Sequence, residues 1–166
     1  MANLVYINEG TSLTWTDTGG DYALDLGGLS AGAVRAGTEG SLGAAPRSGM
    51  YRWTFVVDGW DSSPAVAETV DLYLAFSHDG TQATRDGDLS GTDGAGTTVS
   101  LPNLLFLGSA VVQTTTAGDE IICSGIVQIF HRYITPVVHN RSAGDALLST
   151  SDAHKFILTP IPAEIQ

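Results

Sequence analysis

Basic residues and long apolar runs are both scarce in this sequence. Its 166 residues include 7 Lys and Arg against 18 Asp and Glu, which gives a formal net charge of −11 at pH 7. Nucleic-acid binding depends on clustered Lys and Arg that neutralise phosphates, so DNA and RNA are poor partners. The longest apolar run, residues 104–112, is interrupted by Gly108 and Ser109. It is far shorter than the roughly 20 residues of a membrane-spanning helix, so we expect no membrane partner.

Cysteine is represented by Cys123 alone, which excludes a disulfide within the chain. Its neighbours Ile121 and Ile122 predict a small buried apolar side chain, with a reactive thiol as the remote alternative. The first residues also lack the basic segment and apolar core of a secretory signal peptide. We therefore expect a protein made in the cytoplasm that does not depend on an oxidising compartment.

Charged residues make up only 15% of the chain, and 20 glycines with many Ser and Thr take their place. Disorder does not explain this composition, because 43% of the residues are apolar and they recur periodically. Two such runs lie close together, at residues 50–58 and 70–77. Large apolar side chains occupy every second position in both, which predicts two half-buried strands that pair or lie in facing sheets.

Similar short runs at residues 4–8, 13–16, 22–26, 33–35, 104–113, 121–133, 134–140, 146–149 and 154–159 complete the expected set of strands. Pro136 predicts that 134–140 lies on an edge or at a bend. The near-continuous apolar run 104–113 predicts a strand covered on both faces, and we expect it to form a hairpin with 121–133. Within the latter, Gly125 indicates a bulge or a close backbone approach. No window has the spacing of an amphipathic helix.

The fold class is therefore an all-β, antiparallel β-sandwich with little or no helix, and a jelly roll is the commonest eight-stranded form. We expect one domain over residues 1–166, in which 1–20 form an extended arm or the first strands.

The sharpest chemical motif is Asp86-Gly87-Asp88-Leu89-Ser90-Gly91, in the long polar segment 78–98. Its alternating oxygen-bearing side chains and its glycine at the sixth position resemble a calcium-binding loop. Thr97, however, stands at the twelfth position, where a bidentate glutamate is required, and no helices flank the loop. A solvated acidic loop explains the segment better, so we assign no metal and no cofactor, and cation binding by 86–93 stays open.

No catalytic motif has its expected context in the sequence. The four histidines are scattered without metal-ligand spacing, although His131 and His139 could converge near a strand end. The Gly-x-Ser-x-Gly spacing at Gly28–Gly32 is not a nucleophile elbow, because no helix is expected after it. The glutamates Glu9, Glu39, Glu68, Glu120 and Glu164 lie mostly beside turns. We predict that the protein is not an enzyme and name no catalytic residue. Trp60 lies among turn-forming residues and is the best candidate for an exposed aromatic contact, whereas Trp15 and Trp53 lie in strands.

Five segments together resemble small virion structural proteins of tailed bacteriophages, and within that group capsid decoration (cement) proteins of the jelly-roll kind. They are Val70–Ser77, the Asp/Gly loop to Asp93, Leu101–Gly108, His131–Asn140 and the ending His154–Pro162. The likeness covers about residues 50–162, and its motifs are structural.

The resemblance implies a protein that binds the outside of an assembled capsid and bridges neighbouring major capsid protein subunits, often as a homotrimer. It also implies a location on the virion exterior. An arm that reaches a neighbouring subunit would lie in the first 49 residues, which the likeness does not cover. The alternative is a carbohydrate-binding β-sandwich, of a phage tail or lectin-like module, that uses Trp60 and the 78–98 loop. A hydrolase that acts on glycans or esters is a third hypothesis.

Overall fold

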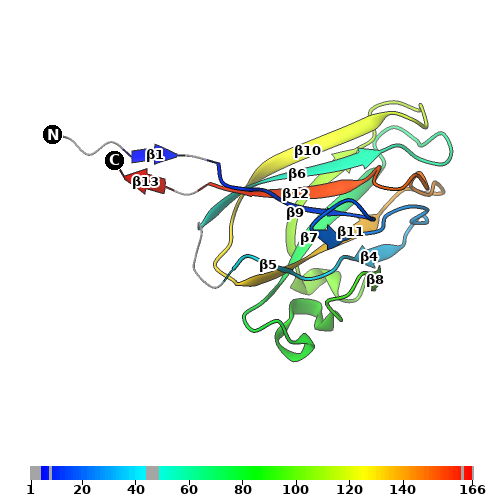
Figure 1. Cartoon of the computed structure of the whole chain (residues 1–166). Coiled ribbons are helices and arrows are strands. Elements are labelled where there is room, and N and C mark those ends of the chain that lie inside the picture. The colour runs from blue at the N-terminus through cyan, green and yellow to red at the C-terminus, as the bar shows by residue number, and fades with distance from the viewer. Residues whose placement is uncertain (1–4, 8, 44–48, 162, 166) are drawn as a thin grey trace.

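The computed structural model describes residues 5–7, 9–43, 49–161 and 163–165, and for 5–7 and 163–165 it describes the backbone alone. Strands are the main regular structure of the described chain (Figure 1). They are β1 (Val5–Ile7), β2 (Leu13–Thr16), β3 (Tyr22–Ala23), β4 (Val34–Ala36), β5 (Gly40–Ser41), β6 (Met50–Asp58), β7 (Thr69–Ser77), β8 (Gly94–Ala95), β9 (Leu105–Val111), β10 (Glu120–Gln128), β11 (Tyr133–Asn140), β12 (Lys155–Pro160) and β13 (Ala163–Ile165). Three single 3₁₀ turns, Gln82–Thr84, Asp86–Asp88 and Leu101–Asn103, are its only helical segments.

Two sheets pack against each other. Sheet I has the strand order β10-β6-β12-β2-β3, and sheet II has the order β8-β4-β11-β7-β9, with β5 beside β11. When β1, β13 and the two-residue strands are set aside, the remaining strands pair first with last: β2 with β12, β4 with β11, β6 with β10 and β7 with β9. This nested antiparallel pairing is the connectivity of an eight-stranded jelly roll. The expected all-β sandwich is therefore confirmed.

The alternation read from residues 50–77 is confirmed in the core between the sheets. Strand β6 turns Tyr51, Trp53, Phe55 and Val57 inward, and all four are buried. Strand β7 contributes Val70, Leu72 and Leu74 from the opposite side. The two strands lie in facing sheets and are not paired with each other. Period-two alternation predicts the inward face correctly, because every second side chain of a strand points to the same face.

The predicted hairpin between residues 104–113 and 121–133 is wrong. Strand β9 pairs with β7 in sheet II, and β10 pairs with β6 in sheet I, so the connection between them crosses from one sheet to the other. The second run is also shorter than expected, because β10 ends at Gln128. The segment 134–140 belongs to β11, which lies between β4 and β7 in sheet II, so the edge position predicted from Pro136 is wrong. Both β9 and β10 end their sheets, and neither is covered on both faces.

The expected strand 22–26 is shortened to β3, yet Leu24 and Leu26 are still fully buried in the core. The expected strand at 146–149 is reduced to one isolated bridge between Leu147 and Trp60. In the Gly- and Ala-rich stretch before β6, the short strand expected near residue 34 is present as β4, and residues 44–48 lie outside the described part of the chain.

Gly125 marks a close approach, as expected, and the register of β10 on β6 is continuous through it. A Cβ atom at Gly125 would lie 2.8 Å from Nε1 of Trp53, and one at Gly108 would lie 2.9 Å from Cη2 of the same indole. Since Gly108 belongs to β9 and Gly125 to β10, the two glycines accommodate one large ring where the edges of the two sheets meet.

The polar segment 78–98 continues to Leu104 and covers part of the outer face of sheet II (Figure 1). A second, smaller apolar cluster lies under it, formed by Val34, Ala36, Ala75, Leu89, Leu101, Leu104 and Val137. Arg85 fixes the segment to β4–β5: its Nε and Nη2 donate to Oε2 of Glu39 at 2.9 and 2.6 Å, and Nη2 also donates to the carbonyl of Gly80.

The two ends of the described chain pair with each other. Strand β1 runs antiparallel to β13, with Tyr6 opposite Glu164, and the pair forms a two-stranded sheet of its own. Figure 1 shows this terminal ribbon, the β1–β13 pair, extending away from one end of the sandwich. The sequence left open whether the first residues form an arm or a first strand. They form both, because β1 lies in the ribbon and β2 lies in sheet I.

Candidate functional site

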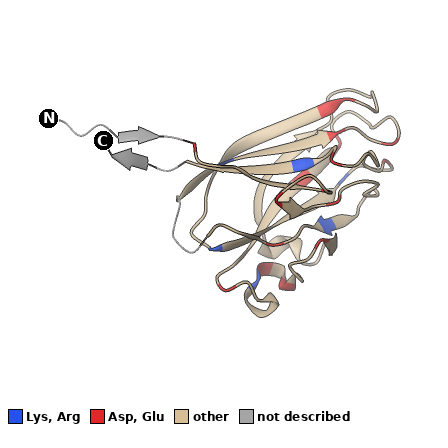
Figure 2. Ribbon diagram, in the orientation of Figure 1, with Lys and Arg blue, Asp and Glu red and all other residues tan. Residues whose placement is uncertain are grey.

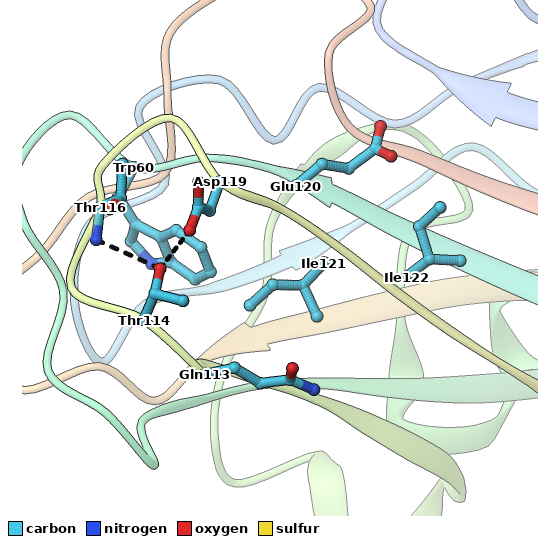
Figure 3. A pocket seen from close by; sticks show the side chains of 8 residues that line it. All are labelled: Trp60, Gln113, Thr114, Thr116, Asp119, Glu120, Ile121 and Ile122. Atoms are coloured by element: carbon cyan, nitrogen blue, oxygen red, sulfur yellow. Dashed lines mark hydrogen bonds between the residues drawn. The ribbon is translucent and has the colours of Figure 1, made fainter.

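A pocket of about 400 Å³ lies beside the connection between β9 and β10 (Figure 3). Its lining combines hydroxyl, amide, carboxylate and apolar groups from Trp60, Gln113, Thr114, Thr116, Asp119, Glu120, Ile121 and Ile122. Thr114 Oγ1 donates a hydrogen bond to Asp119 Oδ2 and accepts one from the backbone N–H of Thr116. Figure 3 shows the carboxylate of Asp119 turned toward Thr114 and that of Glu120 turned away, so the pocket does not bring the two carboxylates together.

Trp60, expected as an exposed contact, is buried, and that prediction is wrong. Only 2% of its surface is exposed, and its backbone N–H donates to the carbonyl of Ala117. Within the described part of the chain its indole N–H has no hydrogen-bond partner. Leu147 and Ala117, from distant parts of the chain, lie against Trp60, whereas the residues that follow it, 61–63, are exposed.

The 78–98 segment lines a different pocket, of about 570 Å³, to which Trp60 does not contribute. The sequence-based carbohydrate hypothesis combined Trp60 with this loop in one site. The structure places Trp60 and this loop at two separate pockets, so they do not form one binding site.

The calcium-like motif uses its carboxylates for internal contacts. Asp86 Oδ2 accepts the backbone N–H of Phe76, and Asp88 Oδ1 accepts from the side-chain amide of Gln82. Asp93 forms a two-point contact with Arg35, through Nε at 2.9 Å and Nη2 at 2.5 Å. Among the described residues no group of three or more His, Cys, Asp or Glu side chains could hold a metal ion. These contacts favour the solvated acidic loop over the calcium site.

The histidines lie apart. His131 stacks on Phe76 at a ring distance of 4.8 Å, just before β11, whereas His139 lies at the far end of that strand. Eight residues of extended chain separate them by roughly 27 Å, so the two do not converge. His78 is exposed beside Asp79.

His154 has a structural role. It is buried, its Nδ1 accepts the backbone N–H of Asp58, and its Nε2 lies 2.9 Å from the carbonyl of Leu148. Since Nδ1 accepts, Nε2 carries the proton and the ring is neutral. Burial lowers the pKa of this imidazole.

Ser, His and Asp meet on the outer face of sheet II, but not in the order that catalysis needs. Asp71 lies opposite Ser109 in one ladder and opposite His139 in the other. Ser109 Oγ donates directly to Asp71 at 2.6 Å, and Arg141 lies 3.3 Å from the other carboxylate oxygen. A catalytic triad needs the histidine between serine and aspartate, where it can take the serine proton. Here the carboxylate is in the middle, and the arrangement is a cross-strand polar cluster.

The remaining sequence candidates are also engaged in structure. Glu39 pairs with Arg85, and Glu68 accepts the backbone N–H groups of Ala65 and Ala143. Glu9 forms an exposed ion pair with Arg52, while the side chain of Glu164 lies outside the described part of the chain. Cys123 is half-buried, and burial raises the pKa of its thiol to about 11, which makes it a poor nucleophile.

The feature that sequence reasoning missed is the exposure of apolar side chains on the two edge strands. Leu105, Phe106 and Val111 on β9 and Ile122 and Ile126 on β10 are all exposed, at 38–64% of their surface, and Phe130 just after β10 is 80% exposed. Figure 2 shows both strands almost free of charged residues. A nearly continuous apolar run has the same sequence pattern whether its side chains are buried or exposed. The exposure of these side chains therefore becomes visible only from the position of β9 and β10 at the edges of their sheets.

Comparison with known proteins found no matching family model, curated protein or solved structure. No helix in the described ranges is long and apolar enough to cross a membrane.

Proposed function

We propose that this chain is a virion structural protein of the capsid decoration type, which binds the outer surface of an assembled phage capsid and stabilises it by bridging major capsid protein subunits. On this proposal it is not an enzyme, and its place is the exterior of the virion. The resemblance of residues 50–162 to phage decoration proteins supplies the kind of partner, and the jelly-roll connectivity agrees with it.

The observation that carries the proposal is the terminal ribbon. A two-stranded ribbon in water is at best marginally stable, and a third strand or a supporting surface is needed to hold it. Within the described part of the chain, β1 and β13 pair with each other and with no strand of sheet I or sheet II. A ribbon that extends from the body toward a neighbouring protein would gain that support from the capsid surface.

The polar chemistry agrees with a binding role. Asp71, Asp86, Asp93 and His154 each make hydrogen bonds within the protein that engage the groups a catalyst would use. Because many copies bind a symmetric shell at once, modest contacts per copy are enough for stable decoration.

The direct test is co-sedimentation of the purified protein with capsids of its own phage. We expect saturable binding, and mass spectrometry of purified virions should give a copy number in the hundreds, in step with the major capsid protein. A few copies per virion, or no binding to the shell, would contradict the proposal and favour a tail component.

A full-length variant separates the ribbon from the sandwich. Tyr6→Pro removes a backbone N–H from β1 and prevents regular pairing with β13, whereas Tyr6→Ala keeps the backbone ladder as the matched control. We expect Tyr6→Pro to weaken capsid binding at unchanged urea resistance, and Tyr6→Ala to retain more of it. Equal binding by the proline variant would show that the ribbon is not the contact.

The carbohydrate-binding alternative keeps one observation in its favour, the polar pocket beside Trp60. Saturable binding on a glycan array, lost in Gln113→Ala, would support it.

A further inference from the structure

Strand β10 is the edge of sheet I: no other strand of the described chain pairs with its outer side, although β9 of sheet II packs beside it. It pairs with β6 on one side only, over the nine residues Glu120–Gln128, without a bulge. Soluble proteins usually block such edges with lysine, proline, bulges or covering segments, because free backbone N–H and C=O groups attract another strand. Strand β10 contains no lysine, arginine or proline, and its one charged residue, Glu120, is at its start.

The outward face of β10 is apolar as well. Ile122 and Ile126 are 57% and 64% exposed, with Ser124 between them. In a chain of net charge −11, most faces would repel a second copy, but this strand is uncharged beyond Glu120 (Figure 2). It is therefore a face on which two copies can meet without facing like charges.

We propose that two copies of this chain associate through antiparallel pairing of their β10 strands about a two-fold axis at Ser124. In this register Ser124 lies opposite the second copy's Ser124, and Ile122 opposite the second copy's Ile126. Glu120 lies opposite Gln128 of the second copy, so that the two glutamates are at opposite ends of the interface. Sheet I thereby continues from one copy into the next.

The sequence of β10 selects this register. In the joined sheet, the outer face of sheet I in one copy lies on the same side as that of the second copy. Directly opposite residues then point to the same side only if the two-fold axis passes through one residue of β10. An axis at Cys123 or at Gly125 places Ile122 opposite Ser124 or Gln128 of the second copy. Only the axis at Ser124 pairs all nine residues and also sets each exposed isoleucine against another apolar side chain.

This inference goes beyond the proposed function and does not depend on it, because the pairing can be measured without a capsid. It also differs from the homotrimer that the resemblance implies. An isologous strand pairing closes with two copies, so the mass of the particle distinguishes the two assemblies.

The first experiment measures the mass of the purified full chain by light scattering during size-exclusion chromatography. We expect about twice the 17.3 kDa of one chain at micromolar concentration. Ile122→Lys with Ile126→Lys should shift the particle to one copy, because lysine on an edge strand opposes further pairing. The matched control is Val66→Lys with Val99→Lys, which makes the same charge change at two exposed valines elsewhere and should leave the pair intact. A monomeric or trimeric wild type, or a pair that survives the β10 lysines, would overturn the proposal.

The second experiment tests the register by cross-linking. Directly opposed residues in an antiparallel pair have Cβ atoms about 4.5–5.5 Å apart, close enough for a disulfide after a small adjustment. In a Cys123→Ser background, Ser124→Cys should give a covalent pair under mild oxidation. Thr54→Cys in the same background is the control, because Thr54 lies beside Ser124 on β6 and away from the free edge. Equal cross-linking at both positions, or at neither, would contradict the register.

Discussion

The buried ion pair between Arg85 and Glu39 allows a quantitative prediction of stability. The side chain of Arg85 is 3% exposed and that of Glu39 is 12% exposed. Replacing Arg85 with methionine keeps most of the volume but removes both hydrogen bonds to Glu39 and the donors to the carbonyls of Gly80 and Leu89. Removing one partner of a buried pair costs about 3–5 kcal/mol, because a buried charge is left without compensation.

Urea unfolding followed by tryptophan emission measures this cost. With a slope of roughly 2 kcal/mol per molar urea, Arg85→Met should lower the midpoint by about 1.5–2.5 M. Because the pair fixes the 78–104 segment, limited proteolysis should also cut that segment faster in the variant. The double variant Arg85→Met with Glu39→Gln should recover part of the loss, since it removes the uncompensated carboxylate.

Arg52→Met is the matched control. Arg52 pairs with Glu9, and their side chains are 51% and 49% exposed. An exposed pair of this kind contributes about 0–1 kcal/mol, so the midpoint should move little. If Arg85→Met were no more destabilising than Arg52→Met, the role assigned to the buried pair would be refuted.

Two further predictions concern the core and its response to acid. Gly125→Ala places a Cβ atom 2.8 Å from the indole of Trp53 and should cost about 1–3 kcal/mol by overpacking, measured by urea unfolding; an unchanged midpoint would show that the indole shifts freely. His154 is neutral in the folded protein with a lowered pKa, so the unfolded chain binds more protons once the pH falls below the ordinary histidine value of 6.5. Stability should therefore decrease as the pH falls from about 7 toward 5, with a flatter dependence in His154→Gln, and equal slopes in the two proteins would contradict this assignment.

The fold could be predicted from sequence where local alternation decides the structure. The strands at residues 50–58 and 70–77 are predicted correctly, because the apolar side chains at every second position identify the buried face of each strand. Which strand pairs with which is not determined by the residues of one strand and its neighbouring turn. The connection between β9 and β10 contains ordinary turn residues, which suit a hairpin and a crossover between sheets equally well.

The candidate site was harder to predict for the same reason. Trp60 is flanked by Gly59 and Asp61, which indicate an exposed loop, yet Leu147 and Ala117 reach it from distant parts of the chain. Arg85 is a single cation in an Asp- and Gly-rich segment, and nothing local indicates that it is buried against Glu39. A lone arginine within a long acidic loop is the one sequence signal that could have indicated a residue holding the loop against the sheet.

The nested strand pairing has a consequence for how the chain folds during synthesis. Strand β12, near the C-terminus, lies between β6 and β2, and residues 156–158 pair with 13–15 from the other end of the sequence. Sheet I therefore stays open along its middle until almost the whole protein has left the ribosome. Contacts between such distant residues close slowly. A chain that stops short of β12 would leave the facing edges of β6 and β2 without a partner strand, and unpaired strand edges promote aggregation.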